Sequence, residues 1–235
     1  MKAFFEKLYK GSKSEFLKAL KANLQNGEKT FIVTANPEAF ICAEKDREMS
    51  EILTDSAVVV ADGIGIVKGG KMLGIDIAER IPGVEIAEEL LKYADKLNKS
   101  VYLFGAKPEV VEKLAETVRQ KYKGAKIAGY CDGYCENKDA RFKEAAALSP
   151  DIILVALGIP AQEKLIYRHI NEFDKGIFVG VGGSFDVLSG TKERAPEFFV
   201  KHNLEWLYRI VKEPKRLKRF YNNNIKFFFK LYGEK

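Results

Sequence analysis

Short apolar runs alternate along this chain with longer stretches that have the hydrophobic spacing of helices. The apolar runs cover residues 30–34, 57–61, 101–104, 126–130, 152–156 and 176–181. Helical spacing covers residues 84–97, 109–122, 138–148 and 161–172. Strand–helix alternation at this spacing implies right-handed crossovers between parallel strands. We therefore expect an α/β fold, a Rossmann-like, mostly parallel sheet flanked by helices.

The first 26 residues have the pattern of a helix that packs on this sheet. Apolar residues recur at helical spacing: Phe16, Leu17, Leu20 and Leu24. Asn26 and Gly27 close the pattern, as is typical of a helix end. We therefore expect helical structure before the first strand, with residues 1–12 polar or helical.

Polar side chains follow the first predicted strand. Pro37 forbids further strand pairing and suits the first turn of a helix that starts near Glu38. Thr34 and Asn36 are thereby placed at the carboxyl end of a strand, where ligands bind in open α/β folds. Asn36 suits two roles equally well, a helix cap and a ligand contact.

Asp62 holds the corresponding position after the second strand. The run at residues 57–61 has no polar alternation, which favours a strand buried on both faces. Asp62 at its end is a candidate catalytic acid or base, or else a cap with Gly63 and Gly65 at positive φ. A glycine-rich passage (residues 63–74) then predicts a loop that approaches a ligand or is mobile. Arg80 beyond it is suited to gripping a diphosphate, or to a surface ion pair.

The last forty residues differ from the rest. We expect an α/β core at residues 1–196 and a helical appendage at residues 197–235. Two apolar helical faces are predicted, the first from Leu204, Leu207, Tyr208 and Val211, the second from Ile225, Phe228, Phe229 and Tyr232. Lysines and arginines are interleaved with them, a pattern typical of helices on an anionic membrane surface. Packing of these faces on the sheet or on another subunit is the alternative.

The charge of the 235-residue chain is concentrated in this tail. The net charge is +6, yet residues 201–235 alone carry ten Lys/Arg and three acids. The expected partner is therefore anionic, such as phospholipid, diphosphate or nucleic acid. No apolar run is long enough to cross a bilayer, and the N-terminus lacks a signal-peptide pattern, so we expect a cytoplasmic protein. Three cysteines without a CxxC pair and two histidines do not suggest a metal site.

Several common nucleotide motifs are missing. The sequence has no GxGxxG fingerprint and no GxxxxGK[ST] phosphate loop, which argues against an ordinary NAD enzyme or ATPase. It also has no Asp-x-Asp, the close carboxylates that usually hold a metal for a nucleotide diphosphate. Arginines, backbone amides and helix N-termini would then neutralise such a ligand. A nucleotide-binding oxidoreductase or regulatory module, and a nucleic-acid-binding protein, remain as competing interpretations.

Six short segments together have a familiar order. They are residues 34–38 (TANPE), 61–63 (ADG), 79–83 (ERIPG), 158–163 (GIPAQE), 180–186 (GVGGSFD) and 194–196 (RAP). On these segments the chain resembles the bacterial WecG/TagA/CpsF glycosyltransferase family, whose wall teichoic acid members are N-acetylmannosaminyltransferases. The tail resembles the family's C-terminal appendage. The N-terminus departs from the family, because members commonly open with a short strand before the first helix.

The resemblance implies a reaction and a set of roles. It implies transfer of N-acetylmannosamine from UDP-ManNAc to undecaprenyl-diphosphate-GlcNAc, with a β-1,4 linkage, inversion and no metal or other cofactor. Related members use glucose or ManNAc uronic acid instead. Asp62 would be the base that deprotonates the acceptor hydroxyl, and Thr34 and Asn36 would position the sugars. The donor would be held by Arg80, Gln162, Gly182, Gly183 and Asp186, and the acceptor diphosphate by Arg209, Arg216 and Arg219. The protein would then lie on the inner face of the cell membrane and bind no nucleic acid, while apolar tail faces also allow a homo-oligomer.

Overall fold

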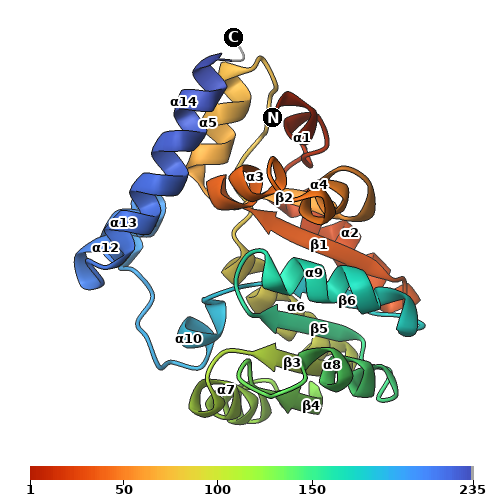
Figure 1. The fold of residues 1–235 in the computed structure, drawn as a ribbon. Helices are drawn as coiled ribbons and strands as arrows, with labels where there is room; N and C mark the ends of the chain where they lie inside the picture. The colour runs from red at the N-terminus through yellow and green to blue at the C-terminus, as the bar shows by residue number, and fades with distance from the viewer. Residues whose placement is uncertain (234–235) are drawn as a thin grey trace.

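The computed structural model describes residues 1–233, and every side chain among them except those of Ser56, Arg216 and Arg219. Its centre is a six-stranded parallel sheet in the order β2-β1-β6-β5-β3-β4 (Figure 1). The strands are β1 (Thr30–Ala35), β2 (Val58–Ala61), β3 (Ser100–Gly105), β4 (Lys126–Cys131), β5 (Ile152–Ala156) and β6 (Ile177–Gly180). Each coincides with a predicted apolar run, so the α/β fold is confirmed.

Helices cover both faces of the sheet, because alternate strand residues bury apolar side chains on opposite sides. One face carries α1 (Lys2–Glu6), α3 (Pro37–Ala43), α4 (Arg47–Glu51), α5 (Ile64–Met72), α8 (Lys138–Ala146), α9 (Ala161–His169) and α14 (Lys226–Gly233). The other carries α2 (Lys13–Asn26), α6 (Gly83–Leu97), α7 (Pro108–Lys121) and α10 (Ser184–Leu188). Three short helical segments are not α-helical. The segments η1 (Ile52–Ser56) and η3 (Tyr221–Ile225) are π-helical, and η2 (Ile170–Glu172) is a 3-10 helix.

The N-terminal segment is helical as expected, in two helices and not in one continuous helix. Two helices, α1 and α2, are separated by residues 7–12. Helix α2 starts afresh at a capping box, in which the Ser12 hydroxyl accepts the Glu15 amide and the Glu15 carboxylate accepts the Ser12 amide. Between the helices, Leu8 forms a parallel bridge with Val59. This segment therefore extends the sheet beyond its edge strand β2.

The glycine-rich passage is mostly a helix, which corrects the expected loop. Residues Ile64–Met72 form α5, and Gly63 before it has a φ of +112°, which favours glycine. A Cβ atom at Gly69 would lie 2.9 Å from the Leu231 side chain of α14. At this position the missing side chain admits a neighbouring helix, not a ligand.

The tail forms α11 (Glu197–Lys201), α12 (Glu205–Lys212), α13 (Arg216–Phe220), η3 and α14. Figure 1 shows α14 lying beside α5, while α12 and α13 extend away from the sheet. Phe227 and Leu231 of α14 are fully buried in the core, whereas Phe229 and Tyr232 are more than 70% exposed. Phe227 and Leu231 therefore form the side of α14 that packs on the core, and the predicted apolar face with Phe229 and Tyr232 lies on another side; periodicity did not distinguish the three consecutive phenylalanines.

Within the described residues, no helix combines the length and apolarity that a membrane-crossing segment requires.

Candidate functional site

Three neighbouring strands carry the predicted site residues at their carboxyl ends. Ala35 of β1 is in register with Ala61 of β2, so Asn36 and Asp62 leave the sheet side by side. On the other side of β1, Val33 is in register with Gly180 of β6. Helix α3 then leaves β1 toward one face and α10 leaves β6 toward the other. Such a divergence is the topological switch point at which open α/β sheets bind ligands.

Asp62 lies at this edge as the sequence predicted. Its backbone amide donates to the Ala35 carbonyl at 2.8 Å, which ties the end of β2 to β1. Burial raises the pKa of the carboxyl to about 6; Glu205 acts in the same direction, while Arg209 and Arg80 oppose it. Gly63, not Asp62, occupies the cap position of α5, so the capping alternative is wrong. A half-buried carboxyl that titrates near neutral pH is suited to proton transfer.

Two arginines meet beside Asp62 through a shared carboxylate. Glu205, the first residue of α12, accepts a hydrogen bond from Arg209 Nη2 at 2.8 Å and lies 3.7 Å from Arg80 Nη1. Arg80 Nη2 also donates to the Val200 carbonyl at 3.2 Å. Arg80 thus ties the tail to the core next to Asp62. Sequence reasoning singled out both arginines but missed Glu205, which is only 9% exposed.

Thr34 and Asn36 are both engaged in holding the local structure. The Thr34 hydroxyl is buried and donates to the Gly180 carbonyl at 2.8 Å, which joins β1 to β6. Asn36 Oδ1 accepts the amides of Glu38 and Ala39, so Asn36 caps α3. The capping role is therefore present. Asn36 Nδ2 has no protein partner among the described residues and remains available to a ligand.

Gln162 connects two glycine turns and is itself buried. Its Oε1 accepts the amides of Gly158 at 3.1 Å and Gly182 at 3.0 Å, and its Nε2 donates to Glu163 Oε1 at 2.7 Å. Glu163 has no exposed surface, and its Oε2 has no partner among the described residues. Burial raises the pKa of Glu163 to about 7. The GIPAQE segment contains Glu163, but nothing in the spacing indicated that an uncompensated acid would be buried there.

The segment at residues 180–186 is not one continuous loop. Gly180 belongs to β6, and Ser184 begins α10, so only residues 181–183 form the turn. Gly182 has a φ of +48°, and Gly183 stands immediately before α10. Asp186 lies on α10 and is 3.7 Å from Lys192 Nζ.

The tail adds basic side chains near the start of α3. A groove of about 430 Å³ is lined by Glu38, Lys215, Lys218, Asn222 and Asn223. Of the three predicted tail arginines, Arg209 is placed beside Asp62, while the side chains of Arg216 and Arg219 lie outside the described part of the chain.

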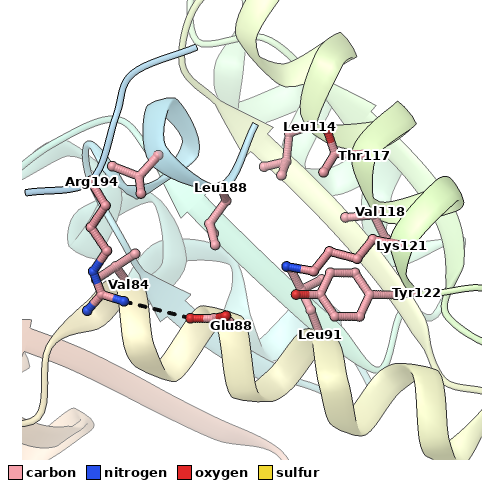
Figure 2. A pocket seen from close by; sticks show the side chains of 11 residues that line it. Val84, Glu88, Leu91, Leu114, Thr117, Val118, Lys121, Tyr122, Leu188 and Arg194 are labelled. Carbon is pink, nitrogen blue, oxygen red and sulfur yellow. Dashed lines mark ion pairs between the residues drawn. The ribbon is translucent and has the colours of Figure 1, made fainter. Parts of the chain in front are cut away.

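A second cavity, of about 180 Å³, lies away from Asp62 between α6, α7 and α10. Figure 2 shows Arg194 on one side of it, pointing to Glu88, and Lys121 and Tyr122 on the other. Arg194 also donates to Glu85 at 2.9 Å. These contacts explain the RAP segment structurally, because Arg194 fastens the chain after α10 to helix α6.

In the described residues, no group of three or more His, Cys, Asp or Glu side chains is arranged to hold a metal ion.

Comparison with known proteins gives consistent matches. The family model described as "Glycosyl transferase WecG/TagA/CpsF family" matches residues 5–235. The chain is 40% identical over 188 residues to the N-acetylglucosaminyldiphosphoundecaprenol N-acetyl-beta-D-mannosaminyltransferase of Bacillus subtilis (strain 168), covering 80% of this chain and 73% of the relative. It is 39% identical over 206 residues to the protein of the same name in Staphylococcus aureus (strain MW2), covering 87% of this chain and 80% of the relative.

Proposed function

The chain belongs to the WecG/TagA/CpsF family of glycosyltransferases, and from this membership we propose that it transfers N-acetylmannosamine from UDP-ManNAc to undecaprenyl-diphosphate-GlcNAc. The β-1,4-linked product would be part of the wall teichoic acid linkage unit. The names of the relatives support the acceptor and the sugar. The observation that carries the proposal on this chain is the placement of one carboxyl, Asp62, beside Arg80 and Arg209 at the carboxyl end of the sheet.

We propose an inverting mechanism in which Asp62 is the general base. The carboxylate takes the proton of the GlcNAc 4-hydroxyl as that oxygen attacks the anomeric carbon of the donor. The sugar–phosphate bond then breaks on the opposite face, and UDP leaves with the bonding electron pair. The pKa of Asp62, about 6, supports the role of general base. At this pKa the carboxyl is mostly ionised at neutral pH, yet it is more basic than a solvated aspartate.

The remaining residues around the switch point position the substrates. Arg80 and Arg209 would stabilise diphosphate charge, the role that a divalent cation would otherwise have. Gln162 supports donor binding by joining the turns at Gly158 and Gly182. Asn36 would contact a sugar through Nδ2, while Thr34 would act by fixing β6 against β1.

Two further predicted donor contacts, Gly183 and Asp186, lie after the end of β6. Gly183 and Asp186 would border the donor at the start of α10. We retain Arg216 and Arg219 as proposed contacts to the acceptor diphosphate, on the resemblance alone.

We propose that the tail, residues 197–235, brings the enzyme to an anionic membrane surface on the cytoplasmic side. Large apolar side chains of this segment are exposed: Phe198, Trp206, Leu207, Val211, Leu217, Tyr221, Phe229 and Tyr232. Interleaved lysines and arginines give the same segment its excess positive charge. Exposed apolar side chains among basic ones are what an interfacial helix presents to anionic lipid.

The decisive experiment combines a donor panel with a base variant. UDP-ManNAc, UDP-GlcNAc, UDP-glucose and UDP-ManNAc uronic acid are each incubated with a short-chain lipid-diphosphate-GlcNAc and EDTA, with products read by mass spectrometry. We expect transfer of ManNAc in EDTA, and a loss of roughly 10²–10⁴-fold in rate for Asp62→Asn. Asp76→Asn, an exposed acid on the neighbouring segment, is the matched control. Transfer at the parental rate by Asp62→Asn would remove Asp62 from the mechanism, and transfer only of glucose or the uronic acid would reassign the donor.

A further inference from the structure

Among the described residues, Glu205 is the acid that pairs with both arginines near Asp62. It lies at the start of α12 with only 9% exposure, and its two oxygens are directed at different partners. Oε1 accepts from Arg209 at 2.8 Å, and Oε2 faces Arg80 at 3.7 Å. A carboxylate shared by two guanidinium groups occupies the geometry in which arginine forks usually bind a phosphate.

The charges of this cluster balance without a ligand. Arg80 and Arg209 supply two positive charges, and Glu205 with ionised Asp62 supplies two negative ones, while the nearby Glu85 is paired with Lys13 and Arg194, each at 2.9 Å. A diphosphate brings two or more further negative charges into the same partly buried space. Because like charges a few ångströms apart repel strongly there, a diphosphate and Glu205 compete for the same arginines.

Glu205 is also carried by an element that can separate from the core. Among the described residues, α11 and α12 are tied to the core by the Arg80–Glu205 pair, the Arg80–Val200 hydrogen bond and, directly after α12, the Lys192–Glu213 pair at 2.9 Å. The α12 helix has eight residues, and its Leu207 and Val211 are exposed. A small displacement of α12 therefore separates Glu205 from Arg80, while Arg209, on the same helix, moves with Glu205.

We propose that Glu205 is an internal stand-in for the diphosphate, which pairs Arg80 and Arg209 in the free enzyme and gives way when a substrate diphosphate binds. Glu205 is thus a positioning residue that sets the affinity of the site for diphosphates. This inference rests on the proposed function for the identity of the natural ligands, a nucleoside diphosphate or a lipid-linked diphosphate. The stand-in itself depends only on the three side chains.

The test measures diphosphate binding to neutral variants of Glu205. Glu205→Gln keeps an oxygen for Arg209 and loses the charge, and Glu205→Ala loses both. Glu197→Gln is the matched control, because Glu197 is likewise the first residue of a tail helix but is exposed and pairs only with Lys201 among the described residues. Calorimetric titrations use UDP in one arm and a short-chain prenyl-diphosphate-GlcNAc in the other, each with a thermal melt.

We expect the neutral variants to bind at least one diphosphate on the order of tenfold more tightly than the parent. The arm that tightens identifies which diphosphate displaces Glu205. We also expect the acid limb of the pH–rate profile to move to lower pH, because Glu205 raises the pKa of Asp62 while Arg209, Arg80 and Glu85 stay in place.

Unchanged or weaker binding in both arms would overturn the proposal. Loss of binding with a fall in the thermal midpoint would overturn it too, because Glu205 would then be only a structural tie. These outcomes are separate from the proposed reaction. A parent enzyme that binds diphosphates but transfers no sugar refutes the reaction and leaves the stand-in intact.

Discussion

The Glu163→Gln variant tests whether an uncompensated acid is really buried under the site. Burial raises the pKa of Glu163 from its ordinary 4.5 to about 7 in the folded protein. The folded state therefore holds a proton that the unfolded state has lost between these two pH values. The contribution of Glu163 to the free energy of unfolding is therefore highest below pH 4.5, falls as the pH rises from 4.5 to 7, and is constant above. At about 1.4 kcal/mol for each pKa unit, the loss amounts to roughly 3 kcal/mol.

Glutamine mimics the protonated acid. It still accepts from Gln162 Nε2, and its amide replaces a protonated Oε2 that also has no partner among the described residues. We therefore expect Glu163→Gln to match the parent near pH 4.5 and to exceed its free energy of unfolding by roughly 3 kcal/mol at pH 8. Urea unfolding followed by circular dichroism, at half-unit steps of pH, measures the difference. A difference that stays constant from pH 4.5 to 8 would refute the reasoning, because Glu163 would then be solvated or paired.

Three other predictions follow from the same structure. Asp151→Asn should show the opposite pH dependence of stability, because hydrogen bonds from Lys175 and Ser100 outweigh burial and lower the pKa of Asp151 to about 2. The variant should lose about 2 kcal/mol of the free energy of unfolding at pH 7, and this difference should shrink as the pH falls from 3.8 to 2. Gly180→Ala should cost about 1–3 kcal/mol in the same assay, because its Cβ would lie 2.6 Å from Gln162 Nε2. Phe229→Ser should weaken sedimentation with anionic vesicles and leave the thermal midpoint unchanged. Leu148→Ser, which changes an apolar residue just after α8 that is 51% exposed against 73% for Phe229, should not affect sedimentation.

Deleting the tail would not be a clean test of membrane contact. Phe227 and Leu231 of α14 are part of the core, where Phe227 packs on Phe5 and Phe40. Truncation after Pro196 would expose these aromatic rings and destabilise the sheet. Point variants on the exposed side of the tail separate lipid contact from folding, which a deletion cannot do.

The sheet was predictable because each strand is a short apolar run between helical patterns. Every run coincides with an observed strand, and strand ends then placed Asn36 and Asp62 at one edge. Hydrophobic periodicity did not predict which side of a helix is buried, or where a helix breaks, when several alignments of the pattern fit equally well. Three consecutive phenylalanines concealed that Phe227 is the buried one, and the N-terminal pattern concealed the break at residues 7–12 where Ser12 starts a new helix.

The acids that tune the site were not predictable, because their importance depends on contacts between distant segments. Glu205 is one of four acids in the basic tail (residues 197–235), and its spacing indicates only an i,i+4 pair with Arg209. Its contact with Arg80 joins residues 125 positions apart. Glu163 follows Gln162 directly in the sequence, yet its lack of a counter-charge depends on the packing of α9 against β6. Local pattern carries neither fact.

The tail and the base are linked electrostatically, and the link has a consequence for catalysis. Helix α12 carries both Arg209, which lowers the pKa of Asp62, and Glu205, which raises it. If α12 moves as a unit to admit a lipid-linked substrate, the two opposing effects leave together and largely cancel. The charges that α12 carries therefore have little net effect on the pKa of Asp62 while the substrate enters. If instead a diphosphate displaces Glu205 alone and takes its place between the arginines, a negative charge still faces Asp62, so the carboxyl stays basic enough to accept the proton of the attacking hydroxyl.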